Sequence, residues 1–427
     1  MNMLVVRSMG RNIRIFSALM LCVVCGSQAA RADVVLDWNT IAVNTAVANK
    51  QNPFAQARYG AIVQLAVFEA VNAITREYQP YLGTITASRG ASAEAAATEA
   101  AYMVLVHYFP ASKPALDADW LSSMGAIPNG QAKTEGIVAG DAAASALMAL
   151  RLHDGSVPAE FKVPGLPVPG EWQATPSCPI VNGVGQGTAY QWQNVTPFGI
   201  ASANDFLLEP PPALTSKEYA RAYHEVMTVG GLNSTERPAD RANVALYYAA
   251  TSPTQVFNQA ARQVSVEKGR SLSENARDLA LINMAISDSL VASFFNKYHY
   301  NFWRPETAIH AGDTDGNPMT EGDPSWAPFI TTPCFPSYPS NHGSAANGAA
   351  EVMRHLYGEG GHAITLSNPA VPTIVLQYAT FREITGDISD ARVFGGIHFR
   401  TDQNAGVVLG RAVGAAVYKN NLRPLDE

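Results

Sequence analysis

Charge, strand patterning and long apolar runs are scarce in this sequence, and each scarcity excludes a class of protein. Only 15% of the 427 residues are charged while 47% are hydrophobic, a composition typical of a globular chain and not of a disordered or fibrous one. Beyond residue 32 no segment approaches 18 uninterrupted apolar residues, so no membrane span is predicted there. Strand-like alternation is nearly absent, and no internal repeat or heptad pattern occurs.

The motifs of several common enzyme classes are missing as well. The sequence has no GxSxG, P-loop or GxGxxG motif in a matching context. Its formal net charge is −7, and an acidic chain is a poor partner for nucleic acid or for an anionic membrane surface. Six histidines show no metal-ligand spacing and are expected to be structural or solvated: His107, His153, His224, His310, His355 and His362.

The first 32 residues have the layout of a secretory signal peptide. Three arginines precede the apolar segment IFSALMLCVVCG, and Ala30-Arg31-Ala32 has the small-x-small form of a cleavage site. We therefore expect residues 1–32 to be removed and the chain to be periplasmic or secreted. The loss of four arginines would take the formal charge from −7 to about −11. An uncleaved membrane anchor is the alternative, although the apolar segment is short for a span.

Only four cysteines are present, and two of them fall within the expected signal peptide. The other two, Cys178 and Cys334, both lie in Pro-rich loop sequence. In an oxidising compartment they could form one disulfide. Because sequence does not give their separation, the pairing stays open at this point.

What the sequence does contain is helical periodicity. Apolar residues recur at three- and four-residue spacing, which predicts one buried face per helix. Ser216 is a plausible helix cap. The Pro- and Gly-rich region 154–213 predicts an ordered surface excursion or, alternatively, a linker between two domains. We predict an all-α fold, a helical bundle with a long surface loop region, in which residues 33–427 form one domain. Helices are expected at 57–78, 91–109, 133–152, 216–230, 234–250, 273–303, 343–357, 371–386 and 402–419.

Three cationic segments lie between residues 297 and 402. In the first, Lys297 and Arg304 are seven residues apart, so on a continuous helix both would project from one face. Pro305 disfavours helix at Arg304 and places that residue at a helix end. Taken alone, this segment could equally hold two solvated cations.

The second segment, CFPSYPSNHGSA (334–345), leads into a predicted helix. Ser340 can cap this helix, and the first N–H groups of a helix carry partial positive charge and bind anions. Small residues such as Gly343 allow a ligand to approach the backbone, and His342 would lie beside it. A histidine that merely points to water is the alternative.

The third segment contains Arg392, His398 and Asp402. On a helix, Asp402 could accept a hydrogen bond from one nitrogen of His398, four residues earlier, and leave the other nitrogen free to attack or to ligate. The guanidinium of Arg392 suits a tetrahedral oxyanion. A surface salt bridge is the alternative for this segment.

In order, the three segments read K-x6-RP, P-S-x-H and R-x5-H-x3-D. This compound pattern resembles the signature of the type 2 phosphatidic acid phosphatases (PAP2), bacterial acid phosphatases and vanadium-dependent haloperoxidases. LDWN (36–39), RLHDG (151–155) and GGIHF (395–399) look like the bacterial haloperoxidase-type branch. The resemblance implies an all-α unit built around four-helix bundles, with the motif-bearing part at about 271–420.

The resemblance also implies roles for the motif residues. Lys297, Arg304 and Arg392 would neutralise the oxygens of bound vanadate or phosphate, and Ser340 with the backbone near Asn341 and Gly343 would donate further hydrogen bonds. His398 would be the direct vanadium ligand or the phosphoryl nucleophile, oriented by Asp402. His342 would be the acid–base group. The implied reaction oxidises a halide with hydrogen peroxide and then halogenates a small organic acceptor.

Two positions depart from the family pattern, and a third bears on the halide. Asn341 replaces the usual Gly of PSGH; Asn is the non-Gly residue that best tolerates a left-handed backbone. Ala391 replaces the Ser that precedes the motif arginine, so one hydrogen bond is lost. Phe335 occupies a position where chloride-oxidising members tend to carry Phe and bromide-specific members His, which makes it a candidate for the halide pocket.

Three functions stay open from the sequence. The first is an exported vanadate-dependent haloperoxidase that oxidises bromide and possibly chloride. The second is a secreted PAP2-type acid phosphatase that hydrolyses phosphate monoesters through a phosphohistidine and needs no cofactor. The third is a non-catalytic anion-binding protein of the same fold. The same anion-binding residues serve the first two, so only the resemblance over the whole chain separates them.

Overall fold

The computed structural model describes residues 33–425, which form one compact unit that is predominantly helical. The predicted signal peptide lies outside the described residues. The prediction of an all-α fold is confirmed. The helices are α1 Val34–Ala48, α2 Pro53–Thr75, α3 Ala93–Tyr108, α4 Lys113–Gly125, α5 Gln131–Leu150, α6 Lys217–Gly230, α7 Ala239–Ala250, α8 Pro253–Lys268, α9 Leu272–Tyr300, α10 Pro305–His310, α11 Asn341–Tyr357, α12 Phe381–Val393 and α13 Arg400–Asn420.

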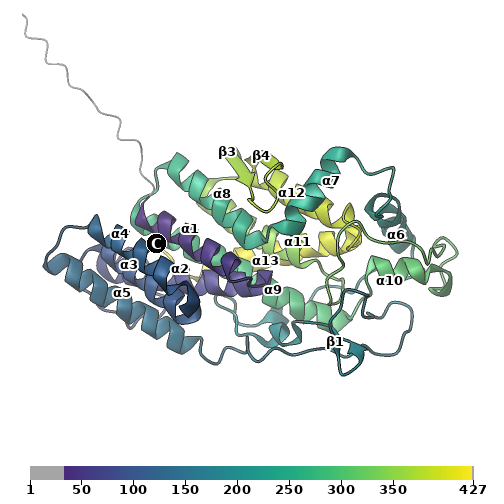
Figure 1. The fold of residues 1–427 in the computed structure, drawn as a ribbon, viewed down its shortest axis with the longest axis horizontal. Helices are drawn as coiled ribbons and strands as arrows, with labels where there is room; N and C mark the ends of the chain where they lie inside the picture. The colour runs from purple at the N-terminus through teal and green to yellow at the C-terminus, as the bar shows by residue number, and fades with distance from the viewer. Residues whose placement is uncertain (1–32, 426–427) are drawn as a thin grey trace, which may run out of the picture. The chain divides into compact units, whose positions relative to one another are not determined.

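The core is built around α9, which packs against α2, α11 and α13 (Figure 1). Ser271 begins α9 in a capping box with Glu274, and nearly every residue of its first six turns is buried. By length and composition α9 is the one helix among residues 33–425 that could cross a membrane, but 94% of its most apolar window is buried inside the protein. This is the burial of a core helix.

Helices α11 and α13 approach each other through glycine. A Cβ atom at Gly410 of α13 would lie 2.2 Å from the carbonyl oxygen of Ser344 in α11, and one at Gly414 would lie 2.5 Å from that of Gly348. No side chain fits at these positions, so the two backbones are in direct contact. The starts of both helices, where the motif residues lie, are therefore held close together.

Two antiparallel hairpins accompany the helices, β1 Ile180–Val181 with β2 Val184–Gly185 and β3 Gly360–Ser367 with β4 Val375–Thr380. The second hairpin shows that the predicted helix at 371–386 is wrong. Its first part, VLQYAT, pairs as β4, since β-branched and aromatic residues suit a strand. Thr380 then caps α12 with Glu383, and the helix begins ten residues later than predicted.

The Pro- and Gly-rich region 154–213 is ordered and irregular, which agrees with the predicted surface excursion. It contains only β1, β2 and two short 3₁₀ segments. Trp172 and Trp192 anchor it by burying their rings. A disulfide joins Cys178 of this region to Cys334, which is the first residue of the second motif segment. The excursion is thus tied to the part of the chain that carries the candidate site.

Candidate active site

The three predicted cations lie together in the protein interior. Lys297 comes from the last turn of α9, Arg304 directly precedes α10, and Arg392 lies in the last turn of α12. Their exposed fractions are 0%, 0% and 3%. Burial is the main cause that lowers the pKa of Arg304 to about 9 and that of Arg392 to about 10. A group of buried like charges is unfavourable unless something compensates it.

Lys297 and Arg304 converge by a route that differs from the predicted one. The helix that carries Lys297 ends at Tyr300, because Asn301 adopts a left-handed backbone with φ of 48°. Arg304 therefore does not share a helix face with Lys297, and that expectation is wrong. His299, between the two cations in sequence, is exposed.

Lys297 uses its three ammonium protons on the loop that leads into α11. Its Nζ donates to the carbonyl oxygens of Pro336 and Ser337, each at 2.8 Å, and to that of Pro339 at 2.5 Å. An ammonium has three donors, so all are occupied. Lys297 thus holds the loop and would act on an anion through its charge, although burial lowers its pKa well below the usual value.

Arg304 and Arg392 each have N–H donors without an acceptor in the protein. Arg304 donates through Nε to the Phe335 carbonyl at 2.8 Å and through Nη1 to that of Ile397 at 2.8 Å, but its Nη2 has no partner. Nε and Nη2 of Arg392 are also buried without partners. None of the ion pairs found within residues 33–425 includes either arginine or Lys297. By contrast, the buried Arg58 and Arg151 both pair with Asp154.

The start of α11 faces these cations. Ser340 caps the helix, its N–H donates to the Asp402 carbonyl at 3.0 Å, and its Oγ accepts from the N–H of Gly343 at 3.2 Å. The Gly343 N–H therefore serves the cap, whereas the first-turn N–H groups of Asn341 and His342 have no acceptor within the helix. Asn341 is helical, so the left-handed tolerance expected of it is not used. Its Oδ1 instead accepts from Ser293 Oγ at 2.7 Å.

His398 and Asp402 form the predicted pair, although His398 precedes α13 instead of lying within it. Nδ1 of His398 lies 2.8 Å from Oδ2 of Asp402, and Nε2 lies 3.0 Å from Nη1 of Arg304. Because a carboxylate accepts and a guanidinium donates, Nδ1 carries the proton and Nε2 presents its lone pair to the site. The nitrogen without a proton is thus Nε2, which accepts a hydrogen bond from Nη1 of Arg304 in this structure.

Sequence reasoning missed Ser337, which orients this pair. Its Oγ donates to Oδ2 of Asp402 at 2.6 Å, and the N–H of Phe399 donates to the same oxygen at 3.1 Å. Ser337 lies three residues before Ser340, within a segment rich in small polar residues. That composition was the signal, but its contact with Asp402 spans 65 residues of sequence.

The ionisation of the site follows from burial and from the three cations. Burial, and then the charges of the cations, lower the pKa of His398 and of His342 well below the usual range, so both rings are neutral near pH 7. Burial also raises the pKa of Asp402 to about 6, against the opposing effect of its hydrogen bond from Ser337 and of Lys297 and Arg304. The unliganded site is therefore cationic, and a bound anion would relieve it.

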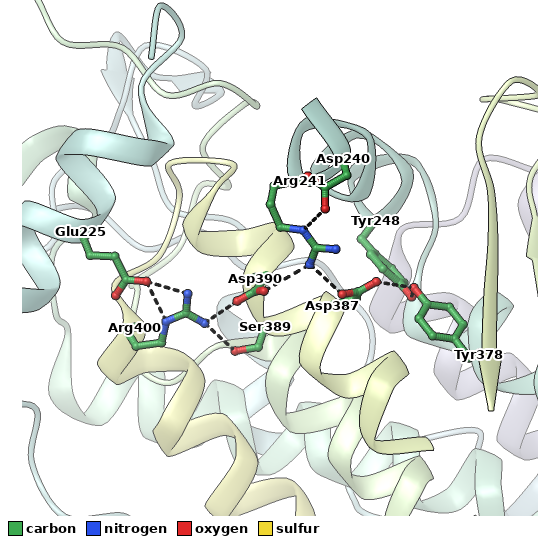
Figure 2. Close-up of polar contacts among 9 residues, drawn as sticks. All are labelled: Glu225, Asp240, Arg241, Tyr248, Tyr378, Asp387, Ser389, Asp390 and Arg400. Atoms are coloured by element: carbon green, nitrogen blue, oxygen red, sulfur yellow. Dashed lines mark hydrogen bonds and ion pairs between the residues drawn. The ribbon is translucent and has the colours of Figure 1, made fainter. Parts of the chain in front are cut away.

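A chain of ion pairs supports the segment that carries Arg392 and His398 (Figure 2). Arg400 at the start of α13 pairs with Asp390 of α12 at 2.9 Å and with Glu225 of α6 at 2.6 Å. Asp390 also pairs with Arg241 of α7, and Arg241 pairs with Asp387. Asp387 in turn accepts a hydrogen bond from Tyr378, which is hydrogen-bonded to Tyr248. The Asp390–Arg400 pair joins the two ends of the segment 390–400, which contains both motif residues.

A cavity of about 550 Å³ opens from the site to the surface. Phe335, the predicted halide-pocket residue, lies in its wall, with its ring 5.3 Å from Nζ of Lys297 and 5.1 Å from the guanidinium carbon of Arg304. His342, Arg392 and His398 line the inner end. All the motif residues predicted from the sequence are therefore gathered at this cavity or directly behind it.

The site suits a tetrahedral oxyanion such as vanadate or phosphate. Unpartnered guanidinium donors, free helix-start amides and uncompensated buried charge are the features that bind such anions. No group of three or more His, Cys, Asp or Glu side chains within residues 33–425 could hold a metal ion. Vanadate would be held as an oxyanion by these donors, and Nε2 of His398 has a lone pair that could coordinate it.

Comparisons with known proteins match part of the chain to one protein family. A family profile described as the VCPO second helical-bundle domain matches residues 277–427. Vanadium chloroperoxidase of Curvularia inaequalis is 28% identical over a match that covers 45% of this chain and 36% of that protein. The chain thus matches little more than a third of this curated relative.

Solved structures share the fold over nearly the whole chain. A bacterial vanadium-dependent iodoperoxidase superposes with a TM-score of 0.76 at 21% identity, covering 92% of this chain and 98% of its own. A bacterial vanadium-dependent chloroperoxidase in its apo form superposes with a TM-score of 0.68 at 15% identity, covering 86% and 93%.

Proposed function

We propose that this chain, whose residues 277–427 match the VCPO second helical-bundle domain, is a vanadate-dependent haloperoxidase of the haloperoxidase-like branch of the PAP2/haloperoxidase superfamily. It would oxidise bromide with hydrogen peroxide to a hypohalous-acid equivalent, and Phe335 extends the proposal to chloride. The buried arginines Arg304 and Arg392, which have unpartnered donors and no carboxylate partner, support an anion site, and the match to a vanadium chloroperoxidase carries the choice of a haloperoxidase over a phosphatase. Vanadate would be the cofactor.

Each residue of the site contributes one task to this chemistry. Arg304 and Arg392 would bind the oxygens of the anion, and the first-turn amides of α11 would add hydrogen bonds. Asp402 keeps the proton of His398 on Nδ1, so that Nε2 carries a lone pair that could coordinate once the anion takes the place of its contact with Arg304. His342, neutral and at the inner end of the cavity, would accept and return the proton of the peroxide. When bound, vanadate supplies a Lewis-acidic centre that activates peroxide toward halide.

A phosphatase remains the second candidate because the same donors would bind a phosphate monoester, with Nε2 of His398 as the nucleophile. The two functions are separated by one paired assay. Purified protein is incubated with orthovanadate and tested for bromide oxidation by hydrogen peroxide, while a vanadate-free portion is tested for hydrolysis of an aryl phosphate. Vanadate-dependent bromide oxidation is expected. Hydrolysis without oxidation, inhibited by vanadate, would instead identify a phosphatase.

Substitution tests the assignment of the site. His398→Ala is expected to abolish bromide oxidation, because it removes the nitrogen that would coordinate vanadate. The matched control is His299→Ala, which removes an exposed histidine next to the same motif and is expected to leave the rate unchanged. Full activity of purified His398→Ala would contradict the assignment.

We further propose that the protein is exported and acts in the periplasm or outside the cell. The signal-like residues 1–32 and the Cys178–Cys334 disulfide support this location, since disulfides persist in oxidising compartments. Expression of the full chain followed by cell fractionation is the test. We expect a shortened protein outside the cytoplasm, and full-length protein confined to the cytoplasm would contradict it.

A further inference from the structure

The cavity that leads to the site changes in character from its outer to its inner end. At the inner end lie the cationic and polar groups Arg392, His398 and Asn341, all buried. The outer rim is formed by Pro53, Leu246, Ala249 and Thr331, which are exposed. Of these rim residues only Thr331 is polar. A molecule that enters would therefore pass along apolar surface before it reaches the charged end.

Aromatic rings dominate the wall between the two ends. Phe54 at the start of α2, Phe329 and Phe335 all line the cavity, and Phe54 packs edge-on against Phe335 with ring centroids 6.5 Å apart. Leu290, Ile330 and Ile397 complete the wall. Aromatic edges and faces favour another ring placed among them. The wall contains no aspartate, glutamate or lysine.

The size of the cavity exceeds what halide and peroxide need. A volume of about 550 Å³ lies within the range of pockets that bury organic ligands of about 10 or more heavy atoms, roughly 300–1,000 Å³. A halide ion, hydrogen peroxide and the vanadate proposed at the inner end comprise one, two and five heavy atoms. An apolar wall also contributes nothing to the binding of the halide or the peroxide, because both are polar and well hydrated. The wall therefore calls for a third reactant.

We propose that this cavity binds the organic acceptor, and that the acceptor is an uncharged, electron-rich aromatic ring of the phenol class. The three phenylalanines would pack against its ring and the apolar rim would exclude water, while the cations at the inner end disfavour a cationic acceptor. The acceptor would then be halogenated while it is bound. This inference rests on the proposed haloperoxidase function.

The chemical step balances without a further reagent. Halide, hydrogen peroxide and a proton give hypohalous acid and water at the inner end of the cavity. The bound ring then gives up an electron pair to the halogen, a C–H bond is replaced by a C–halogen bond, and the released proton joins the hydroxide of the hypohalous acid as water. The ring is oxidised by two electrons and the halogen is reduced by two. A ring held in the cavity would meet the oxidant before bulk solvent does.

Equilibrium binding tests the inference without turnover. 2-Naphthol is titrated into the vanadate-free full-length protein by isothermal titration calorimetry, and tyramine serves as a cationic phenol for comparison. We expect saturable one-to-one binding of 2-naphthol and at least tenfold weaker binding of tyramine. Equal affinity for the two probes, or no saturable binding of 2-naphthol, would overturn the inference.

A rim substitution with a matched control locates the binding site. Leu246→Gln removes apolar surface at the rim and should fold normally, since Leu246 is 40% exposed. Loss of part of one apolar contact is expected to weaken 2-naphthol binding about three- to tenfold. Leu121→Gln makes the same change on α4, where the side chain is 64% exposed and far from the cavity lining, and should have no effect. Identical affinities of the two variants would overturn the location.

Iodide oxidation separates this inference from the proposed function on which it rests. Triiodide formation from iodide and hydrogen peroxide needs no organic acceptor, so it reports the haloperoxidase chemistry alone. Its absence in the vanadate-loaded wild type would refute the proposed function. If triiodide forms and 2-naphthol binds, we expect the ratio of 2-naphthol bromination to triiodide formation to fall at least threefold in Leu246→Gln. An unchanged ratio would refute bound-state halogenation only.

Discussion

Asn341 shows how one residue can keep the site cationic. Its side chain lines the cavity beside His342, and its Oδ1 is fixed by the hydroxyl of Ser293. Because an amide is neutral, nothing in this position offsets the charges of Arg304 and Arg392. A carboxylate of nearly the same shape would do so.

Asn341→Asp is therefore expected to weaken vanadate binding by roughly tenfold or more, since a like charge next to the anion repels it. Calorimetric titration with orthovanadate measures this. Asn341→Gly is the control, because it removes the side chain with its Ser293 hydrogen bond, worth about 1 kcal/mol of unfolding free energy, and adds no charge. Wild-type affinity in Asn341→Asp would show that this position does not face the anion.

The histidines make anion binding depend on pH. The pKa values of His342 and His398 are lowered by burial and by the three cations, and a bound anion would raise both. Asp402 has a pKa of about 6, and its protonation also favours anion binding because it removes a negative charge from the site. Anion binding is thus coupled to proton uptake.

We expect the affinity for sulfate, a tetrahedral anion that does not titrate in this range, to rise as pH falls from 7 to 5. Isothermal titration calorimetry at several pH values measures the slope. His342→Ala should make the slope shallower, because one of the groups that takes up a proton is gone. A flat profile in the wild type would rule out the coupling.

At the scale of elements, the starts of α11 and α13 and the end of α12 are joined by polar contacts. The Asp390–Arg400 pair closes the loop between α12 and α13, and Glu225 holds the same arginine from α6 (Figure 2). Within this loop Gly396 has a φ of +82°, which permits the tight turn between Arg392 and His398. The ion pairs thus position two motif residues without touching the anion.

Arg400→Gln is expected to lower the unfolding free energy by only about 1 kcal/mol, because the ion pairs are partly exposed. The fractional loss of vanadate affinity should be larger than the fractional loss of stability, because the segment 390–400 carries both Arg392 and His398. Denaturant unfolding and vanadate titration measure the two effects. Lys113→Gln, which breaks an exposed pair with Asp117 on α4, is the control and should change neither. A loss of stability without a loss of affinity would indicate a purely structural role.

Much of the chemistry was predictable from sequence because it depends on local spacing. His398 and Asp402 are four residues apart, and their contact survives although the helix begins only at Arg400. Ser216 begins its helix as predicted. The contacts of Lys297 were not predictable, because they depend on the path of the loop at 336–339, which is set by tertiary packing. The residues of the cavity wall were not predictable for a similar reason, because α2, α7 and residues 329–335 are far apart in sequence.

At the scale of the whole molecule, the Cys178–Cys334 disulfide spans 156 residues and joins the irregular excursion to the segment that enters α11. Cys334 is followed by Phe335, whose carbonyl accepts from Arg304 and whose ring lines the cavity. The bond therefore restrains both a long loop and one wall of the site.

Replacement of both cysteines by serine is expected to lower the unfolding free energy by about 2–5 kcal/mol. The disulfide restricts the unfolded chain, and without it the unfolded state regains this conformational entropy. Denaturant unfolding of the oxidised wild type and of the variant measures this. The reduced wild type should behave as the variant does, and equal stability of all three would show that the excursion is held by packing alone.

The direct backbone contact between α11 and α13 has a consequence for how such a protein can evolve. Gly410 and Gly414 leave no side chain between the two helices, so their spacing cannot change when neighbouring side chains are exchanged. His342 and Asp402 are carried on these helices, while the cavity wall comes from α2, α7 and residues 329–335. Mutations can therefore reshape the wall for new molecules while the reactive groups keep their places. The contact between α11 and α13 thus fixes the positions of the reactive groups, whereas the residues that line the cavity can change without moving them.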